Sequence, residues 1–227
     1  MTNQEKRFSL LSRIRKMLIL LVTLYAMLAM LHWPIGYTFF TQLSNLYAAA
    51  IVACQLLLRR RGKTLFLLKY TAAVSITLTF LVFLCVLAPI HPRGILGAYM
   101  QDHGSSLCMH LINPILTVWD FLDDARSGCP LTRRHIFLAV LPPLGYFVFI
   151  LILGRCGLRW AGMTAPYPFL NYVAPAGWFG FRPDTIDRTT LGVGVFYTVL
   201  AMLGIVLLIG WLLQFAVHRM KKVPYSE

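Results

Sequence analysis

The sequence predicts an all-α fold, namely a single bundle of six transmembrane helices with both termini in the cytosol. Hydrophobic residues make up 58% of the 227 positions and charged residues only 13%, whereas soluble domains keep roughly a quarter of their residues charged. The mean hydropathy is +0.69. The apolar residues gather in six runs, and most basic residues fall on one side of the membrane that these runs imply. We therefore expect one integral membrane domain over residues 1–227.

Six apolar runs define the predicted spans. Each approaches the roughly 20 residues that a helix needs to cross the hydrocarbon core. They cover residues 17–33, 38–58, 69–90, 107–122, 135–154 and 189–217. The first run follows a basic segment, as a signal peptide would, but no small-residue cleavage site with a polar continuation follows, so we expect an uncleaved helix. The fourth run contains His110, Asn113 and Asp120. Lipid cannot satisfy such groups, so we expect this helix to face protein.

The basic residues set the predicted orientation. Of the 21 Lys and Arg residues, 16 lie in segments that the six spans place on one side, namely 1–16, 59–69, 123–135 and 218–227. The other five lie on the opposite side. By the positive-inside rule the first side is cytosolic. We expect the protein to reside in the plasma membrane. The same placement explains the net charge of +13 as orientation signals near anionic headgroups, so we predict no nucleic-acid partner.

The longest predicted outer loop, residues 155–188, is rich in aromatic residues, although a loop in water is normally polar. Tyr and Trp favour the membrane–water interface. Two interpretations stay open. The stretch Tyr167-Pro168-Phe169-Leu170 anchors the protein in the outer leaflet, or it covers a pocket between the helices.

Polar residues at membrane depth mark the candidate site, because burying them without partners costs free energy. Thr38, Thr41 and Asn45 share one helical face of the second span, and His110 and Asn113 share one face of the fourth. Thr41 and His110 each lie a few residues inside the outer end of their span, hence at similar depth. A hydroxyl and an imidazole at one level meet the first requirement of an activated nucleophile. The alternative is structural: the threonine bonds its own helix backbone and the histidine packs in the core.

A second cluster near the outer face, made of His91, Asp102, His103 and His110, contains residue types that bind zinc. It lacks the HExxH or HxxxH spacing of zinc sites, so we predict no metal. We expect no cofactor either, because the sequence contains no Walker, GxGxxG or GxSxG motif.

Three aspartates, Asp120, Asp123 and Asp124, follow near the predicted inner end of the fourth span. We expect them to lie in a solvated turn. Asp120 is about ten residues, or two to three helical turns, from His110. It is therefore too far away to orient that imidazole as the third member of a triad.

Three short blocks occur in order along the chain: Phe39-Phe40-Thr41, then Met109-His110 with Pro114, then Gly145-Tyr146 followed by Tyr167-Pro168-Phe169-Leu170. Together they resemble the androgen-induced-gene and androgen-dependent TFPI-regulating-protein family, including its microbial relatives, over about residues 35–177. The resemblance implies a six-helix membrane hydrolase with a threonine nucleophile and a histidine partner. Animal members of that family cleave fatty acid esters of hydroxy fatty acids. On the matching blocks, Thr41 corresponds to the nucleophile and His110 to the histidine.

The chain departs from the family pattern at two places. The spacing from His110 to Pro114 is one residue shorter than in the animal proteins, and Phe181-Arg182-Pro183-Asp184 is inserted after Pro175.

From the residues and the resemblance together we expect an intramembrane lipid-ester hydrolase. Thr41 attacks the ester carbonyl and His110 takes its proton. Asn45, Asn113 and Tyr167 are the candidate oxyanion or pocket residues. The expected partner is a lipid within the bilayer, on the family pattern a fatty acid ester of a hydroxy fatty acid. The alternative is a non-catalytic lipid-binding or transport protein that uses the same polar pocket, although no repeat between two halves supports a transporter.

Overall fold

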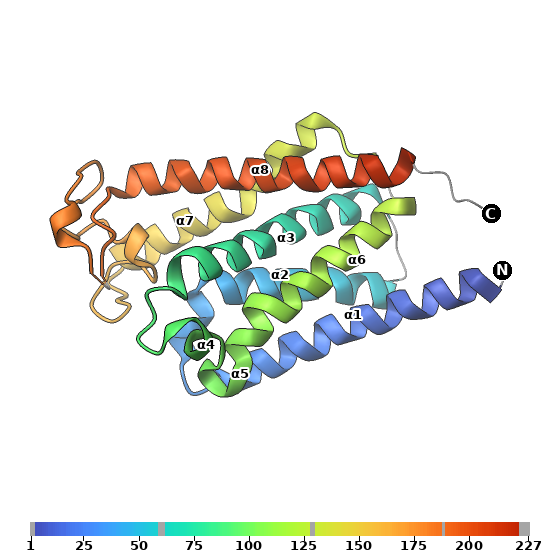
Figure 1. Cartoon of the computed structure of the whole chain (residues 1–227), viewed down its shortest axis with the longest axis horizontal. Helices are drawn as coiled ribbons and strands as arrows, with labels where there is room; N and C mark the ends of the chain where they lie inside the picture. Colours follow the sequence, from blue (N-terminus) through green and yellow to red (C-terminus); the bar gives the residue numbers. More distant parts are fainter. Residues whose placement is uncertain (1–2, 59–61, 128–129, 188, 223–227) are drawn as a thin grey trace.

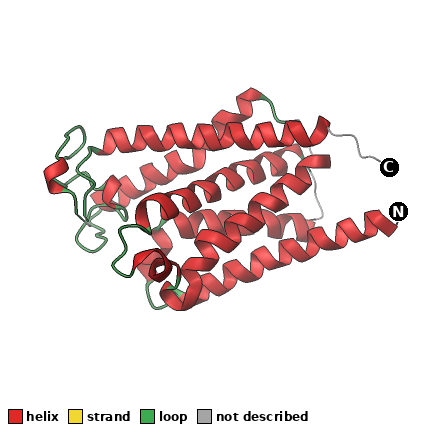
Figure 2. Ribbon diagram, in the orientation of Figure 1, coloured by secondary structure: helices red, strands yellow, loops and turns green. Residues whose placement is uncertain are grey.

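The computed structural model describes residues 3–58, 62–127, 130–187 and 189–222. Within these ranges every regular element is helical (Figure 2), and the only β-type contacts are two isolated bridges within residues 160–193. The predicted all-α class is therefore confirmed. Helices overlap all six apolar runs of the sequence.

Six helical rods run along the long axis of the bundle (Figure 1). The first three are α1 (Asn3–Ala29), α2 (Phe40–Leu58) and α3 (Lys63–Val82), which continues as the π-helical turn η2 (Phe83–Leu87). The fourth is made of α5 (Gln101–Leu107), the π-helical turn η3 (Cys108–Ile112) and α6 (Asn113–Ser127). The fifth joins η4 (Arg133–Val140) to α7 (Leu141–Arg155), and the sixth is α8 (Val195–Lys222).

Short helical elements complete the connections. They are η1 (Pro34–Thr38), α4 (Gly94–Tyr99), η5 (Pro168–Leu170) and η6 (Pro183–Thr185). The segment 91–106, which connects the third and fourth predicted spans, thus holds α4 and most of α5. Asp102, His103 and Gly104 have positive φ angles of 47°, 57° and 82°, and these left-handed residues produce a sharp kink within α5.

Four of the rods are long and apolar enough to cross a membrane, within the part of the chain that the structure describes. They cover Phe40–Leu57, Lys63–Leu87, Arg133–Arg155 and Val195–Met220. The other two rods carry more polar groups. Arg15 and Lys16 lie on α1, and Asn113 and Asp120 lie on α6. These apolar helices indicate a membrane protein.

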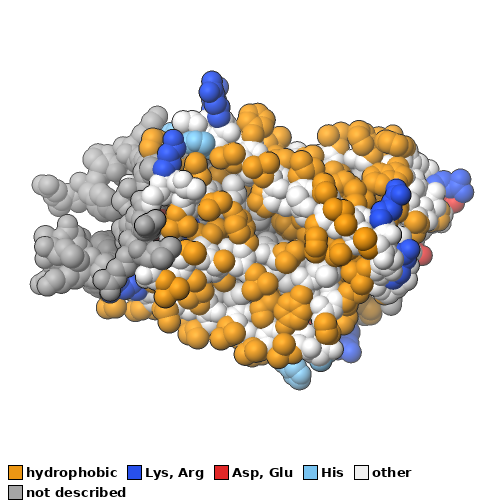
Figure 3. All heavy atoms as spheres, turned by 180° about the vertical axis from the view of Figure 1, so that it is seen from behind, with side chains coloured by type: hydrophobic (Ala, Val, Ile, Leu, Met, Phe, Trp, Pro, Cys, Tyr) orange, Lys and Arg blue, Asp and Glu red, His pale blue; other side chains and the backbone are white. Residues whose placement is uncertain are grey.

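On the face shown in Figure 3, hydrophobic side chains cover most of the surface, and Lys and Arg lie mostly toward the two ends. Even the charged helix α1 has an apolar outer face, where Leu18, Leu21 and Leu28 are exposed. An exposed apolar surface of this extent is unfavourable in water and suited to lipid. The fourth rod also contributes to it, because Ile115 and Trp119 are exposed. The polar residues of this rod, His110, Asn113 and Asp120, are buried against protein as expected, and only its apolar face is exposed.

Helix α3 lies at the centre of the bundle and packs against α2, α6 and α8 (Figure 1). Its small residues Ala72 and Ala73 are fully buried and allow close approach of the neighbouring helices. Tyr70 of α3 packs on Phe121 of α6, with ring centroids 5.8 Å apart. This core packs α3, α6 and α8 together.

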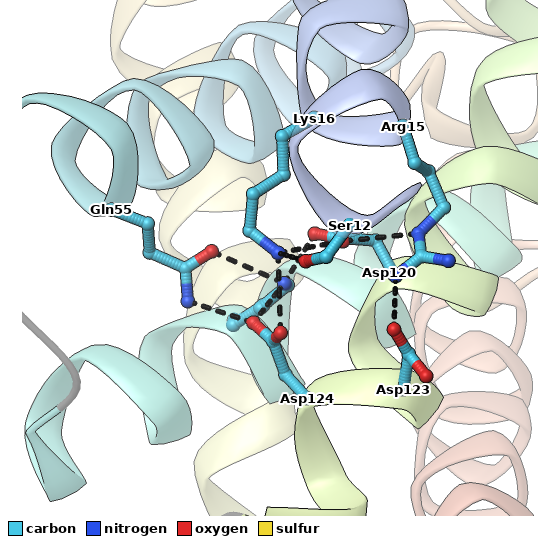
Figure 4. A network of polar contacts seen from close by, with 8 residues as sticks. Ser12, Arg15, Lys16, Gln55, Asp120, Asp123 and Asp124 are labelled. Atoms are coloured by element: carbon cyan, nitrogen blue, oxygen red, sulfur yellow. Dashed lines mark hydrogen bonds and ion pairs between the residues drawn. The ribbon is translucent and has the colours of Figure 1, made fainter. Parts of the chain in front are cut away.

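A buried ionic network joins α1, α3 and α6 near the end of the bundle where α1 begins (Figure 4). Asp120 is 0% exposed. One of its carboxylate oxygens accepts hydrogen bonds from Arg15 Nε (3.1 Å) and Lys16 Nζ (2.7 Å). The other oxygen contacts Lys69 Nζ. The expected solvated turn at the aspartates is therefore wrong, because three cations from two other helices enclose Asp120.

The neighbouring carboxylates complete the charge balance of this network (Figure 4). Asp124 accepts from Lys69 Nζ (2.5 Å) and Lys16 Nζ (3.1 Å), and Asp123 accepts from Arg15 Nη2 (2.6 Å). The amide of Gln55 on α2 donates to Asp124 (3.0 Å) and accepts from Lys69 (3.1 Å). Three cations thus face three carboxylates. Arg15, Lys16 and Lys69, which the sequence assigns to anionic headgroups, instead point into the protein.

Candidate active site

An apolar cavity of about 70 Å³ lies among α2, α3, α7, α8 and the outer loop. Its wall is built mainly from aliphatic and aromatic side chains, including Leu78, Val82, Phe147, Phe169 and Met202. Only four hydroxyl-bearing residues interrupt this surface, and they are Thr41, Thr79, Tyr146 and Tyr167. A mostly apolar cavity with a few convergent polar groups is the usual form of a small-molecule site.

Thr41 reaches the cavity because α2 begins just before it. The turn η1 starts at Pro34, and Phe39 is extended (φ −76°, ψ 148°), so the helix starts at Phe40. Thr41 therefore lies in the first turn, where backbone N–H groups have no intrahelical partner. Thr41 is buried, with 5% of its surface exposed. Thr38, which the sequence places on the same helical face, belongs to η1, where its hydroxyl donates to Ile35 O (2.6 Å).

Tyr167 approaches Thr41 from the outer loop. Its phenol interacts with the Thr41 hydroxyl and with the backbone N–H groups of Phe40 and Thr41. The ring stacks on Phe169 with centroids 5.1 Å apart and meets Phe39 edge-on at 5.4 Å. These contacts fix the phenol over the first turn of α2.

The loop segment that carries Tyr167 is folded back onto the helices. Leu170 N donates to Tyr167 O (2.9 Å), which closes the turn η5. Thr198 of α8 donates its hydroxyl to Phe169 O (2.7 Å) and ties this turn to the bundle. Tyr167, Phe169 and Leu170 are buried and line the cavity. Of the two interpretations of this aromatic stretch, the geometry favours the pocket cover over the simple anchor.

His110 lies in the π-helical turn η3, opposite the π-helical turn η2. Its imidazole stacks on Phe83 of η2 with centroids 3.7 Å apart and an interplanar angle of 13°. It also lies against the Thr79 carbonyl. The residue is 8% exposed, and its Nδ1 has no hydrogen-bond partner among the described residues. Paired π-helical turns are rare and frequently occur at functional sites.

The turns that carry Thr41 and His110 meet across the bundle, although His110 is not part of the cavity wall. Asn45 Nδ2 donates to both Thr41 O (2.8 Å) and Met109 O (3.3 Å), and Met109 directly precedes His110. Thr79 lies in the wall, and its hydroxyl is hydrogen-bonded to that of Ser44 (3.0 Å). The imidazole thus lies behind the wall, against the backbone of Thr79, and does not itself line the cavity.

Asn45 and Asn113 connect helices and do not line the cavity. Asn113 Nδ2 donates to Thr23 Oγ1 of α1 (2.9 Å) and to Asn45 Oδ1 (2.5 Å). Both amide nitrogens therefore already serve two acceptors each. The oxyanion role of Asn45 and Asn113 stays a prediction. It is not favoured by the hydrogen bonds that both amides already make outside the cavity wall. Of the three candidates from the sequence, only Tyr167 lies in the cavity wall.

Sequence reasoning assigned no role to Tyr146, which lies in the cavity wall and is 9% exposed. Its hydroxyl faces the Phe40 backbone and the Tyr167 side chain. The signal that could have found it is a hydroxyl in the middle of the fifth apolar run, since polar groups at membrane depth are usually functional or paired.

The candidate zinc ligands do not converge. His91 Nε2 is hydrogen-bonded to Gln101 Nε2 (2.7 Å), and His103 is exposed at the kink of α5, whereas His110 is buried beside Phe83. No group of three or more His, Cys, Asp or Glu residues that could hold a metal ion occurs in the described part of the chain.

No protein-family model, curated protein or solved structure matches this chain. The family resemblance therefore depends on its three short sequence blocks. Residues of each block, namely Thr41, His110, Tyr146 and Tyr167, lie in or directly behind the wall of one cavity.

Proposed function

We propose that this chain is a six-span membrane protein that hydrolyses lipid esters, with Thr41 as the nucleophile and His110 as the general base. The observation that carries the proposal is the Thr41 hydroxyl in the wall of an apolar cavity, with the Tyr167 phenol beside it. An apolar cavity favours an acyl chain, and a hydroxyl in its wall is where a carbonyl group would react.

The membrane topology in this proposal has both termini in the cytosol. The N-terminal end of α1 and the C-terminal end of α8 lie at the same end of the bundle, which supports an even number of spans (Figure 1). The burial of Arg15, Lys16 and Lys69 removes three orientation signals from the cytosolic side. That side still holds most of the Lys and Arg residues. Arg59, Arg60, Arg61 and Arg188 also belong to the 21 basic residues that set the predicted orientation, but they lie outside the described ranges.

The proposed reaction runs through an acyl-enzyme. Thr41 Oγ1 attacks the ester carbonyl carbon while its proton passes to His110, directly or through one water, and a tetrahedral oxyanion forms. The oxyanion collapses, the C–O bond to the alcohol breaks, and the proton on His110 goes to the leaving alkoxide. A water molecule then attacks the acyl-Thr41 carbonyl, gives its proton to His110, and releases the fatty acid as the proton returns to Thr41. The balance is ester and water to acid and alcohol.

His110 suits the role of base in its local bonding. One side of the imidazole lies against the Thr79 carbonyl, and Nδ1 is buried without a partner among the described residues. Buried polar atoms in native proteins are normally hydrogen-bonded, so an unpaired ring nitrogen calls for a function. A general base must come within hydrogen-bond reach of the proton it takes, directly or through a water. The proposal therefore requires the imidazole to turn, or a water to bridge it, past Thr79.

A non-catalytic lipid-binding or transport protein is the second candidate. The specific observation in its favour is that His110 lies behind the cavity wall, so that no hydrogen bond joins Nδ1 to Thr41. Such a protein would hold a lipid in the same cavity without chemistry.

A fluorophosphonate probe separates these two functions. The hydrolase proposal predicts a covalent adduct on Thr41, found by peptide mass spectrometry and absent from the Thr41→Ala variant. Thr77→Ala is the matched control, because the Thr77 hydroxyl only donates to Ala73 O of its own helix (2.7 Å). Labelling that persists in Thr41→Ala and maps elsewhere, or no labelling of the folded wild-type protein, would favour the binding protein.

A further inference from the structure

The Tyr146 hydroxyl is a buried polar group that the proposed mechanism does not use. It has no hydrogen-bond partner of normal geometry among the residues that the structure describes, although the residue is only 9% exposed. Tyr146 lies in the wall of the cavity and points toward the Phe40 backbone and the Tyr167 phenol. Because buried hydroxyls in native proteins are almost always paired, this one is expected to meet a ligand atom.

The groups around that hydroxyl are hydrogen-bond donors. The phenols of Tyr146 and Tyr167 both lie by the backbone N–H groups at the start of α2. Phe39 precedes the helix, and its side chain has no acceptor with which to cap them. The 19-residue helix α2 has no acidic side chain in its first turn. The partial positive charge of this helix end is therefore directed at the cavity, where oxygen acceptors bind favourably.

A lipid-sized groove adjoins these donors. It lies between α2, α3 and α7, has a volume of about 370 Å³, and shares Phe40 and Tyr146 with the cavity. The two shared rings pack with centroids 5.1 Å apart and lie where the groove and the cavity meet. Leu43, Pro142 and Phe149 give most of the groove an apolar lining. An acyl chain in this groove would bring its carbonyl end to Tyr146.

We propose that Tyr146, Tyr167 and the N–H groups of Phe40 and Thr41 form a subsite for an acyl oxygen. The oxygen is the carbonyl oxygen of a lipid ester and equally a carboxyl oxygen of a free fatty acid. The cavity wall contains no Lys or Arg, so the subsite fits an acyl group and not a phosphate headgroup. For the ester, the subsite rests on the proposed hydrolase function and supplies its oxyanion donors. For the free fatty acid it does not depend on hydrolysis.

Binding of cis-parinaric acid, a fluorescent fatty acid, to the purified protein in detergent tests the subsite. Tyr146→Phe removes only the hydroxyl, and the dissociation constant of the variant should rise at least about tenfold, the lower end of the effect of one hydrogen bond to a charged group. Tyr25→Phe is the matched control. The Tyr25 hydroxyl donates to His103 O (2.7 Å), and Tyr25 lines neither the groove nor the cavity, so binding should stay unchanged. Hexadecane, which has the chain but no oxygen atom, should compete equally well in wild type and Tyr146→Phe.

Equal affinity of wild type and Tyr146→Phe for cis-parinaric acid, or no saturable binding to the wild type, would overturn the subsite. A measurement of ester turnover on the same proteins separates the two proposals. Tyr146-dependent acid binding without turnover would keep the subsite and end the hydrolase function. Ester turnover together with acid binding that does not depend on Tyr146 would keep the hydrolase function and end the subsite.

Discussion

Lys69→Met should strongly destabilise the protein, because Lys69 is the cation that two buried carboxylates share. It is 1% exposed, and its Nζ contacts Asp120 and lies 2.5 Å from Asp124. Removing it leaves three carboxylates facing two cations, with Asp120 fully buried. Breaking a buried pair in this way costs about 3–5 kcal/mol, whereas a surface ion pair is worth about 0–1 kcal/mol. The loss is comparable to much of the usual stability of a folded domain.

Thermal unfolding of the purified protein in detergent, followed by tryptophan fluorescence, measures this effect. A loss of that size should lower Tm by on the order of 10 °C. Lys63→Met is the matched control, since Lys63 begins the same helix α3 but is exposed, and it should change stability by less than about 0.5 kcal/mol. The double variant Lys69→Met/Asp120→Asn leaves two cations facing two carboxylates, so it should lose less than the sum of the single variants. A Tm for Lys69→Met equal to that of Lys63→Met would refute the assignment of net stability to the network.

Three further predictions concern the site and the topology. Thr41→Ala should abolish lipid-ester turnover, and Thr41→Ser should retain part of it. His110→Ala should lower turnover by ~10²–10⁴-fold, the usual effect of a lost general base. Turnover by a folded Thr41→Ala protein would contradict the assignment of the nucleophile. Phe169→Ala should open the cavity cover and lower the turnover of a long-chain ester relative to that of a short-chain ester. Both rates are measured on protein that stays monodisperse. An unchanged ratio of long-chain to short-chain turnover would exclude the covering role. In a cysteine-free background, a membrane-impermeant maleimide should label Leu96→Cys in intact cells but label Lys63→Cys only after the cells are permeabilised. Both positions are exposed, and they lie at opposite ends of the bundle. The reverse labelling pattern would invert the topology.

The positions of the helices were predictable from the sequence because span length and apolar composition are local properties. The buried ionic network was not. Arg15 and Lys16 lie more than 100 residues from Asp120 in the sequence, and nothing on either helix alone distinguishes an inward-pointing charge from one near headgroups. The three aspartates looked like a solvated turn because their partners lie on other helices. Pairing of charges across helices depends on packing, which a single sequence does not reveal.

The candidate site was predictable to the level of its segments. Depth along a helix places Thr41 and His110 near one level, and Asn45 does join their turns. Helical facing brings Asn45 and Asn113 together but does not predict that they lie outside the cavity wall, because that depends on how each helix is rotated against its neighbours. Tyr146 was missed because a tyrosine in an apolar run fits a packing role as well as a polar one. Only the unpaired state of its hydroxyl distinguishes the two roles.

Rapid acid quenching of a reaction with a long-chain ester, followed by peptide mass spectrometry, would show whether Thr41 carries an acyl group during turnover. The proposed mechanism predicts the mass of the acyl chain on the peptide that contains Thr41 in the wild-type protein. It also predicts no acyl peptide in Thr41→Ala. Turnover by the wild-type protein with no acyl group on Thr41 at any quench time, and undiminished turnover by Thr41→Ala, would contradict the threonine nucleophile.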